Sequence, residues 1–242
     1  MKIFVVTDNR WWLDKIYKLF GSRGYVFKCY CSPKGASIFS EEIKSGYIEI
    51  VDLKKQCDEL LKNFDIGLSV HCKQIFPERL VNSIRCINIH PGLNPYNRGW
   101  FPQVFSIINK KPIGATIHIM DQQVDHGDIL LQSEVAIYEW DTSKTVYERV
   151  VDAEYSLLED NLTRVIDGTI TPKKMTGEGN YNSIADYVQI KEIDMDKVVT
   201  MREAIDYLRA LTHSPYKNAY FYTGNGEKVF VSLDLEKDSQ SL

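Results

Sequence analysis

The sequence lacks the glycine-rich turn that marks dinucleotide-binding proteins. Its first apolar run, residues 2–6, leads into residues 7–11 (TDNRW), where such proteins carry Gly-x-Gly-x-x-Gly. Nicotinamide binding therefore has little support. The sequence also has no run of about 18 uncharged apolar residues, and charged residues occur from Lys2 onward. We therefore expect no membrane span and a protein that stays in the cytoplasm.

Charge and cysteine content exclude two further classes. Lys and Arg number 29 against 33 Asp and Glu, a formal net charge of −4, so the basic field that nucleic-acid binding exploits is missing. The five cysteines are odd in number, and Cys29 and Cys31 are followed by no second Cys/His pair at zinc-site spacing. We expect reduced thiols in the core, no metal and no nucleic-acid partner.

What the sequence does contain is a repeated alternation of short apolar runs with segments of helical spacing. Such repeats predict an α/β fold with a Rossmann-like, mostly parallel sheet and helices on both faces. The runs 114–120 and 129–137 are too close for a helical crossover and are expected to be antiparallel neighbours. The predicted strands before them are 2–6, 25–31, 47–51, 66–70 and 84–89, and the predicted helices are 11–20, 54–63 and 103–109.

Composition changes after residue 170. Residues 141–143 supply N-cap chemistry for a long helix that Gly168 ends, and the regular pattern is then lost. We place the main domain at residues 1–170, a loop-rich linker at 171–199 and a small C-terminal piece at 200–242.

The C-terminal piece predicts a helix and a β-hairpin. The helix is expected over residues 201–211, and the hairpin strands over 219–223 and 228–233. A hairpin of this size cannot form its own core, so its apolar side chains must pack against another surface. We therefore expect this piece to mediate a homodimer. The side chains concerned are Val229, Val231 and Leu233.

The most informative segment, residues 87–99 (INIHPGLNPYNRG), starts at the end of an apolar strand and continues as a turn-rich loop. Reactive groups in open α/β sheets collect beyond the carboxyl ends of the strands. Asn88 and His90 are two residues apart, so both project to one face of a strand. An amide donor beside an imidazole suits acyl transfer. Asp125, in the turn between two predicted strands, offers a carboxylate that can orient the imidazole.

Taken singly, each of these motifs has a purely structural explanation. An Asn-x-His pair after a strand more often satisfies polar groups of the loop, and an aspartate in a turn more often caps that turn. The two motifs together, in this order on these elements, favour catalysis. The other histidines that we considered, His71, His118 and His126, receive the structural interpretation, His118 as a satisfied residue of a strand.

Together these segments resemble the signature of the folate-dependent formyltransferases. That family includes the methionyl-tRNA, glycinamide ribonucleotide and nucleotide-sugar N-formyltransferases, and the resemblance covers roughly residues 1–170. It rests on Asn-x-His, Leu-x-Pro-x-x-Arg-Gly, Gly-x-Thr and Val-Asp-x-Gly. The matching residues are Asn88 and His90; Leu93, Pro95, Arg98 and Gly99; Gly114 and Thr116; Val124, Asp125 and Gly127.

The resemblance implies a direct attack of an unprotonated amine on the formyl carbon of 10-formyltetrahydrofolate. Asn88 and His90 would hold the developing oxyanion, and Asp125 would position His90 and assist removal of the amine proton. It also implies that the loop after residues 66–70 binds the pterin, with the turn before Asp125 completing the pocket. The alternative is that Phe76 and Pro77 merely turn the chain. The implied cofactor-binding residues are Gln74, Ile75, Phe76, Pro77, Asp121 and Val124.

Within the family, the sequence is most similar to the nucleotide-sugar branch. The glycine-rich phosphate loop of the glycinamide ribonucleotide enzymes is absent, and only 43 residues follow the linker, too few for the full C-terminal barrel of the methionyl-tRNA enzymes. Residues 94–103 look like the loop that the sugar enzymes place beside an amino sugar. The expected acceptor is a sugar linked to deoxythymidine diphosphate (dTDP), with dTDP-4-amino-4,6-dideoxyglucose preferred and a 3-amino-3,6-dideoxyhexose as runner-up.

A diphosphate needs cations and donors, and a thymine needs an aromatic face. The expected substrate-binding residues are Asn9, Arg10, Trp11, Lys73, Asn94, Arg98, Trp100, Tyr216, Lys217 and Tyr222. The product would feed O-antigen, lipopolysaccharide or other surface-polysaccharide synthesis. Two other functions stay open: a formyltetrahydrofolate hydrolase, and a nucleotide-sugar-binding module without catalysis.

Overall fold

The computed structural model describes residues 1–177 and 179–238. These residues form two compact units, each assembled from separate stretches of chain. Unit 1 comprises residues 1–90, 116–132 and 154–176. Unit 2 comprises residues 91–115, 133–153 and 177–242, as far as they are described. Each unit is considered by itself below.

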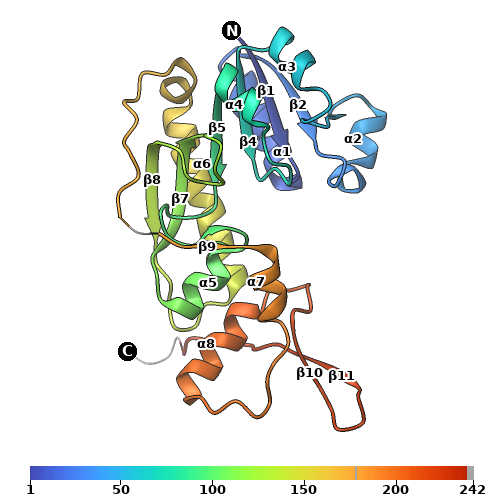
Figure 1. Ribbon diagram of the computed structural model, residues 1–242, viewed down its shortest axis with the longest axis vertical. Helices are drawn as coiled ribbons and strands as arrows, with labels where there is room; N and C mark the ends of the chain where they lie inside the picture. The colour runs from blue at the N-terminus through green and yellow to red at the C-terminus, as the bar shows by residue number, and fades with distance from the viewer. Residues whose placement is uncertain (178, 239–242) are drawn as a thin grey trace. The chain divides into compact units, whose positions relative to one another are not determined.

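The sheet is seven-stranded, in the order β3-β2-β1-β4-β5-β7-β8 (Figure 1). The strands from β3 to β5 pair in parallel, whereas β5 and β7 pair antiparallel. This confirms the mostly parallel α/β sheet with a mixed edge. The strands are β1 Lys2–Thr7, β2 Val26–Cys31, β3 Glu49–Ile50, β4 Ile66–Val70, β5 Arg85–His90, β7 Ile113–Ile119 and β8 Ile129–Val135.

The last two strands also run in opposite directions. The backbone N–H of Ile119 donates to Asp128, and the Thr116 hydroxyl accepts from Gln132. Because the partner number rises as the β7 residue number falls, β7 and β8 are antiparallel neighbours, as the short connection predicts.

Strand β1 shows why helices cover both faces of the sheet. Its residues 3–6 are all buried, and successive side chains enter two different apolar clusters. Ile3 and Val5 face one cluster, and Phe4 and Val6 face the other, as the two-residue repeat of a strand requires. Full burial of each such side chain contributes roughly 1.5–3 kcal/mol.

Helices close both clusters. The first cluster contains apolar residues of α1 and α6, and the second contains residues of α3 and α4. Gly168, in a left-handed conformation (φ 72°), follows the last residue of α6, as predicted. The short helices α2 and α4 were not predicted, because five or six residues carry too little periodicity. The bounds are α1 Arg10–Gly21, α2 Ser40–Lys44, α3 Cys57–Asn63, α4 Glu78–Ser83 and α6 Ser143–Asp167, with a 3₁₀ turn η1 at Ala36–Ile38.

Unit 2 has its own apolar cluster, formed by residues of α5, α6, α8 and β10. Helix α8 has the predicted bounds, Met201–Leu211, and the antiparallel hairpin β10 Ala219–Tyr222 and β11 Lys228–Val231 lies within the predicted strands. The expected linker contains regular structure, because Ser183 and Asp186 form a capping box that begins a short helix. The remaining elements are α5 Pro102–Asn109, β6 Arg98–Gly99, β9 Tyr181–Asn182 and α7 Ile184–Gln189.

Two further observations concern the length of apolar helices and the state of the cysteines. Within residues 1–177 and 179–238, no helix is both long and apolar enough to cross a bilayer. All five cysteines are free thiols, and four of them are buried. Burial raises the pKa of Cys86 to about 12, so this thiol stays protonated at neutral pH.

Candidate active site

Strand β5 presents two polar side chains near its carboxyl end. Ile87 and Ile89 are buried in the first apolar cluster, so the alternate residues Asn88 and His90 share the opposite face. His90 is the last residue of β5, one position beyond the predicted strand end. The side chain of His90 is only 4% exposed.

The antiparallel pairing of β5 with β7 brings a third side chain to this face. Asn88 lies opposite His118, and His90 lies opposite Thr116. His118 is 1% exposed. Sequence patterns do not predict that His118 lies beside Asn88, because this register joins positions 30 residues apart.

The turn between β7 and β8 supplies the carboxylate. Asp125 has φ 50°, a left-handed conformation that aspartate adopts more readily than most residues. Two residues later the backbone comes so close to β7 that a Cβ atom on Gly127 would lie 1.8 Å from the Ile119 carbonyl oxygen. Only glycine fits there. The Asp-x-Gly spacing therefore folds the turn back so that Asp125 reaches β5.

Asp125 bridges the residues of the predicted trio. The Asn88 amide donates to Asp125 Oδ1 at 2.9 Å, and His90 Nδ1 lies 3.5 Å from Asp125 Oδ2. The Asp125 side chain is 9% exposed. In such a shielded setting, charge–charge and charge–dipole interactions are stronger than in water. We call Asn88, His90, His118 and Asp125 the Asp125 cluster.

His118 takes part in this cluster as well as in the strand. Its Nδ1 lies 2.9 Å from the Ile119 carbonyl oxygen, which can only accept a proton, so Nδ1 carries the hydrogen. In the neutral ring Nε2 is then an acceptor, and it lies 3.3 Å from the Asn88 amide nitrogen. His118 Nε2 is also 3.5 Å from Asp125 Oδ1. The prediction that His118 is only a satisfied strand residue is therefore incomplete.

The loop after β4, predicted to hold the pterin, presents fewer side chains than expected. Gln74 is engaged with the neighbouring chain: its amide donates to the Val51 carbonyl and its carbonyl accepts from Leu53 N–H. Phe76 is 4% exposed and its ring stacks on Phe4 in the second apolar cluster. Ile75, at 77% exposed, is the apolar side chain that this loop offers to a ligand. Pro77 precedes α4.

The turn before Asp125 is held by its own hydrogen bonds. Asp121 accepts from His126 Nδ1 at 2.7 Å and from the backbone N–H of Gln123 at 2.9 Å. Val124 is 40% exposed. His126 is thus bound to Asp121, in agreement with the structural interpretation of this residue.

The residues that follow β1 are mostly engaged with the protein. The side-chain carbonyl of Asn9 caps α1 by accepting from Trp11 N–H, and Arg10 forms an ion pair with Glu42. The Trp11 ring, 40% exposed, contacts Tyr155 edge to face. The backbone N–H of Lys73 donates to Asp8. Among the described residues, no ion pair is formed by the side chain of Lys73, the other cation of unit 1 predicted to bind phosphate.

A buried acid beside these residues was not predicted from the sequence. Glu154, on α6, is fully buried and lies 2.7 Å from His71 Nε2, while His71 Nδ1 lies 3.3 Å from the Asn9 amide nitrogen. Burial raises the pKa of Glu154, and the facing His71 opposes that change. The sequence could have revealed this buried acid. Glu154 lies between Val150 and Leu158, at a position where the helical spacing predicts an apolar, core-facing residue.

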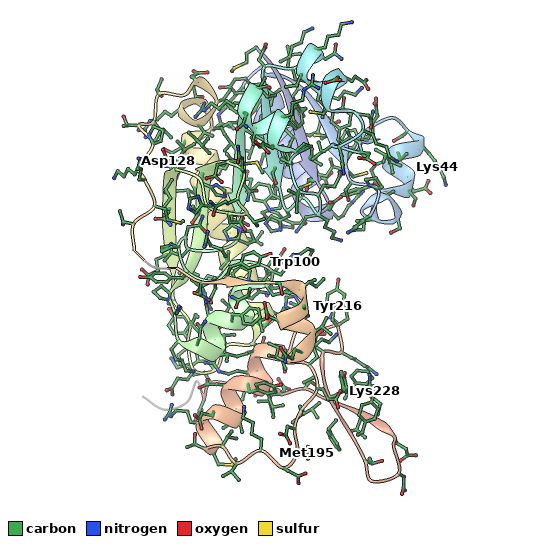
Figure 2. The ribbon with its side chains drawn as sticks, viewed as in Figure 1. Lys44, Trp100, Asp128, Met195, Tyr216 and Lys228 are labelled. Carbon is green, nitrogen blue, oxygen red and sulfur yellow. The ribbon has the colours of Figure 1, made fainter. Side chains whose placement is uncertain are left out.

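The other predicted substrate-binding residues belong to unit 2. Asn94 is buried at 3% exposure, Arg98 begins β6, and Trp100 is 37% exposed. On the C-terminal piece, Tyr216 and Tyr222 are 69% and 48% exposed. Figure 2 labels Trp100 and Tyr216 among the side chains of this unit. The ammonium group of Lys217 lies 5.7 Å from the ring centroid of Phe230.

Comparisons with known proteins define the class to which this fold and cluster belong. Residues 50–162 match the model of the formyl transferase family, and residues 186–237 match that of the N-formyltransferase dimerization C-terminal domain. The chain belongs to the formyl transferase family, and it is a formyltransferase enzyme.

Individual relatives make the similarity more specific. The dTDP-4-amino-4,6-dideoxyglucose formyltransferase of Mycobacterium tuberculosis is 45% identical over 187 residues, which is 77% of this chain and 80% of the relative. A solved 4-N formyltransferase from Francisella tularensis is 54% identical, covers 98% of both chains and has a TM-score of 0.95. A sugar N-formyltransferase from a Shewanella species is 42% identical, with 98% coverage of both chains and a TM-score of 0.92.

Proposed function

We propose that this enzyme transfers the formyl group of 10-formyltetrahydrofolate to the amino group of dTDP-4-amino-4,6-dideoxyglucose. The observation that carries the proposal is the Asp125 cluster, in which one carboxylate lies within 3.5 Å of Asn88 and His90 at the carboxyl end of β5. The relationship to enzymes named for 4-amino sugars supports the choice of acceptor.

Asn88 is placed to donate to the formyl oxygen. Its amide nitrogen has two acceptors, Asp125 Oδ1 at 2.9 Å and His118 Nε2 at 3.3 Å, and these lie only 3.5 Å from each other. One N–H can therefore be shared between them, while the second N–H is directed away from this pair. That second N–H would donate to the oxyanion, an interaction worth about 3–4 kcal/mol in comparable sites.

His90 and Asp125 would manage the remaining charge and the proton. As the amine nitrogen attacks the formyl carbon, the bond from that carbon to N10 of the folate breaks. The amine then loses a proton and N10 gains one. An imidazole held 3.5 Å from a carboxylate can donate to the oxyanion, and the carboxylate stabilises the imidazolium form. Asp125 can also accept the amine proton, directly or through a water molecule.

The formyl donor is supported by a more distant relative. A formyltransferase from Anoxybacillus kamchatkensis was solved with UDP-4,6-dideoxy-4-formamido-L-AltNAc and tetrahydrofolate. It is 25% identical, covers 78% of this chain and 89% of its own, and has a TM-score of 0.63. In this chain we place the folate ring against Ile75 and Val124, the exposed apolar side chains of the two predicted pterin loops.

A 4-amino acceptor is favoured over the 3-amino alternative. The relatives named for 3-amino sugars are only 20–21% identical, which supports a shared fold alone. The methionyl-tRNA alternative is also less well supported, since a Bacillus pumilus enzyme of that name is 30% identical over 79% of this chain but matches over only 62% of its own length. For the nucleotide sugar, the loop from Asn94 to Trp100 in unit 2 supplies the contacts that we propose.

The C-terminal piece would join two copies of the chain. It matches a dimerization domain, and its hairpin exposes apolar and aromatic side chains: Val229 is 37% exposed, Phe230 46% and Tyr222 48%. Pairing would bury them. We further propose that the enzyme works in the cytoplasm and that its product supplies surface-polysaccharide synthesis.

The test is a panel of nucleotide amino sugars incubated with 10-formyltetrahydrofolate and read by a mass gain of one formyl group. The proposal expects dTDP-4-amino-4,6-dideoxyglucose to give the highest kcat/KM. Preference for the 3-amino sugar would contradict the choice of acceptor. Rapid loss of the formyl group without any amine would instead show a hydrolase.

A further inference from the structure

Four asparagines in unit 2 form a closed hydrogen-bond network that we call the asparagine cluster: Asn97, Asn109, Asn180 and Asn182. The Asn97 amide oxygen accepts from the amides of Asn109, Asn180 and Asn182 at 2.7, 2.6 and 3.2 Å. Its amide nitrogen donates to Ser106 Oγ at 2.8 Å and to Asn109 Oδ1 at 3.2 Å. Asn97 is fully buried.

The backbone of Asn97 explains why an asparagine stands there. Its φ of 48° lies in the left-handed region, which asparagine tolerates better than most residues. Its backbone N–H donates to Asn180 Oδ1 at 3.0 Å, and Lys111 donates to the same oxygen at 2.9 Å. The four amides of the cluster are neutral, and Lys111 is a charged neighbour. The cluster therefore fixes the local backbone and contains no acid or base that could take part in proton transfer.

The cluster ties two segments together along their backbones. Strands β6 and β9 pair in parallel, with Arg98 opposite Tyr181. Further hydrogen bonds run from Trp100 N–H to the Asn182 carbonyl and from Asn180 N–H to the Pro95 carbonyl. The approach is so close that a Cβ atom on Gly99 would lie 2.5 Å from the Asn182 carbonyl oxygen.

Two side chains on this ribbon are available to a ligand. Tyr181 is 48% exposed, and its ring lies directly against Gly99, within 2.6 Å of where a Cβ atom would be. The Nε–H of Arg98 is buried and has no hydrogen-bond partner in the part of the chain that the structure describes. A buried donor without an acceptor is costly unless a ligand supplies one. An aromatic face beside an unused guanidinium N–H suits a hexose with hydroxyl or phosphate oxygens.

We infer that residues 180–182 are part of the surface that binds the amino-sugar acceptor, and that Asn97 positions them against the loop from Asn94 to Trp100. Asn97 is then a positioning residue, and Tyr181 contacts the sugar. This inference rests on the proposed function, because it takes the acceptor to be a nucleotide amino sugar. It assigns an acceptor role to a segment that the sequence analysis treated as a linker.

The test compares steady-state kinetics of Asn97→Gly and Tyr181→Ala with those of the unaltered enzyme. Glycine keeps the left-handed backbone and removes only the amide, and Tyr181 is exposed enough that its truncation leaves the fold intact. Asn225→Ala, in the exposed hairpin turn, is the matched control. We expect KM for the nucleotide amino sugar to rise about tenfold or more, since small misplacements of a binding loop have effects of this order. KM for the formyl donor should change by less than about twofold.

The two variants separate this inference from the proposed function. If the unaltered enzyme does not formylate the 4-amino sugar, the proposed function fails. If it does, and both variants keep the KM of the unaltered enzyme for the sugar, the inference is overturned. An equal rise in both KM values would also overturn it, because that is the result of general loosening. A rise confined to the sugar, with Asn225→Ala unchanged, supports it.

Discussion

Two polar clusters in this protein have similar hydrogen-bond arrangements and differ in charge. Each is centred on a residue in the left-handed region, Asp125 (φ 50°) in unit 1 and Asn97 (φ 48°) in unit 2. The Asp125 carboxylate lies within 3.5 Å of three side chains, and the Asn97 amide oxygen accepts from three amides. The first cluster contains two imidazoles, and the second contains four neutral amides.

This difference separates reaction from positioning. A carboxylate between imidazoles can shift a proton and a charge near neutral pH, whereas amides do neither. Hydrogen bonds tie the members of each cluster together, so both clusters fix a local backbone. Only the Asp125 cluster has the groups that acyl transfer needs. Changes in the two clusters should therefore affect different kinetic constants.

The largest expected effect follows from removing the imidazole or the charge of the Asp125 cluster. His90→Asn and Asp125→Asn should each lower kcat by about 10³-fold or more, because a donor or a proton acceptor is lost in the transition state. KM for the nucleotide sugar should change little. The check is single-turnover product formation, with Asp65→Asn as the control, since Asp65 accepts from the backbone N–H of Lys2 and lies outside the Asp125 cluster. Near-normal turnover by His90→Asn would remove the Asp125 cluster from the chemistry.

A second expected effect concerns the stability that a buried charged pair, Asp141 and Arg149, gives to unit 2. Asp141 is 2% exposed and forms two hydrogen bonds with Arg149, each 3.0 Å long. Burial alone would raise the pKa of Asp141, but the hydrogen bonds from Arg149, Tyr138 and Thr145 outweigh it, so the pKa lies below the ordinary value. Asp141→Asn should therefore reduce the free energy of unfolding by about 3 kcal/mol at pH 7, because it removes the carboxylate that pairs with the charge of Arg149.

The sign of the pH dependence follows from the lowered pKa. The stabilisation by Asp141 is present above its unfolded pKa of about 3.9 and is lost as pH falls through the folded value. The difference between the unaltered enzyme and Asp141→Asn should thus shrink below about pH 4. Denaturant titrations at several pH values measure it. A difference that stays constant down to pH 3 would contradict the assigned role of the charge.

A third prediction isolates the backbone strain at the centre of the asparagine cluster. Asn97→Gly and Asn97→Ala both remove the amide, but only alanine must enter the left-handed region with a Cβ atom. The free energy of unfolding of Asn97→Ala should therefore be about 1–2 kcal/mol lower than that of Asn97→Gly. Chemical denaturation at neutral pH measures the difference, which should not vary with pH. Equal stability of the two variants would show that the backbone relaxes at this position.

The smallest expected effect on catalysis lies outside both clusters. Phe230, 46% exposed on β11, belongs to the segment that matches the dimerization domain. Phe230→Glu would place a charge in the proposed dimer interface and should shift the sedimenting mass toward the monomer. Because neither cluster is altered, kcat should stay within about threefold. A dimer of unchanged stability would place the interface elsewhere; Lys62→Glu, an exposed residue of α3 outside the segment that matches the dimerization domain, is the control.

The sequence predicted the elements whose pattern is local. Strand β4 and helix α8 have the predicted bounds, and Asn88, His90 and Asp125 do lie together. The trio could be predicted because its two motifs together resemble the family signature, although Asn88 and Asp125 are 37 residues apart. The catalytic roles of these residues remain predictions that the experiments above test.

What the sequence did not predict depends on contacts between distant positions. His118 reaches Asn88 only through the register of β5 on β7. Asn97 and Asn180 are 83 residues apart and meet because β9 pairs with β6. Sequence periodicity does not predict which distant residues pair. The polar contacts of His118 and Asn97 can therefore be recognised only in the three-dimensional structure.

The central claim is that the Asp125 cluster moves a formyl group to an amino sugar. The most direct test is to incubate the enzyme and its His90→Asn variant with 10-formyltetrahydrofolate and dTDP-4-amino-4,6-dideoxyglucose, and to follow the mass of the nucleotide sugar. The account predicts a gain of one formyl group with the unaltered enzyme and almost none with the variant, while both still bind the nucleotide sugar. Equal formylation by the two proteins, or no formylation by either, would contradict it.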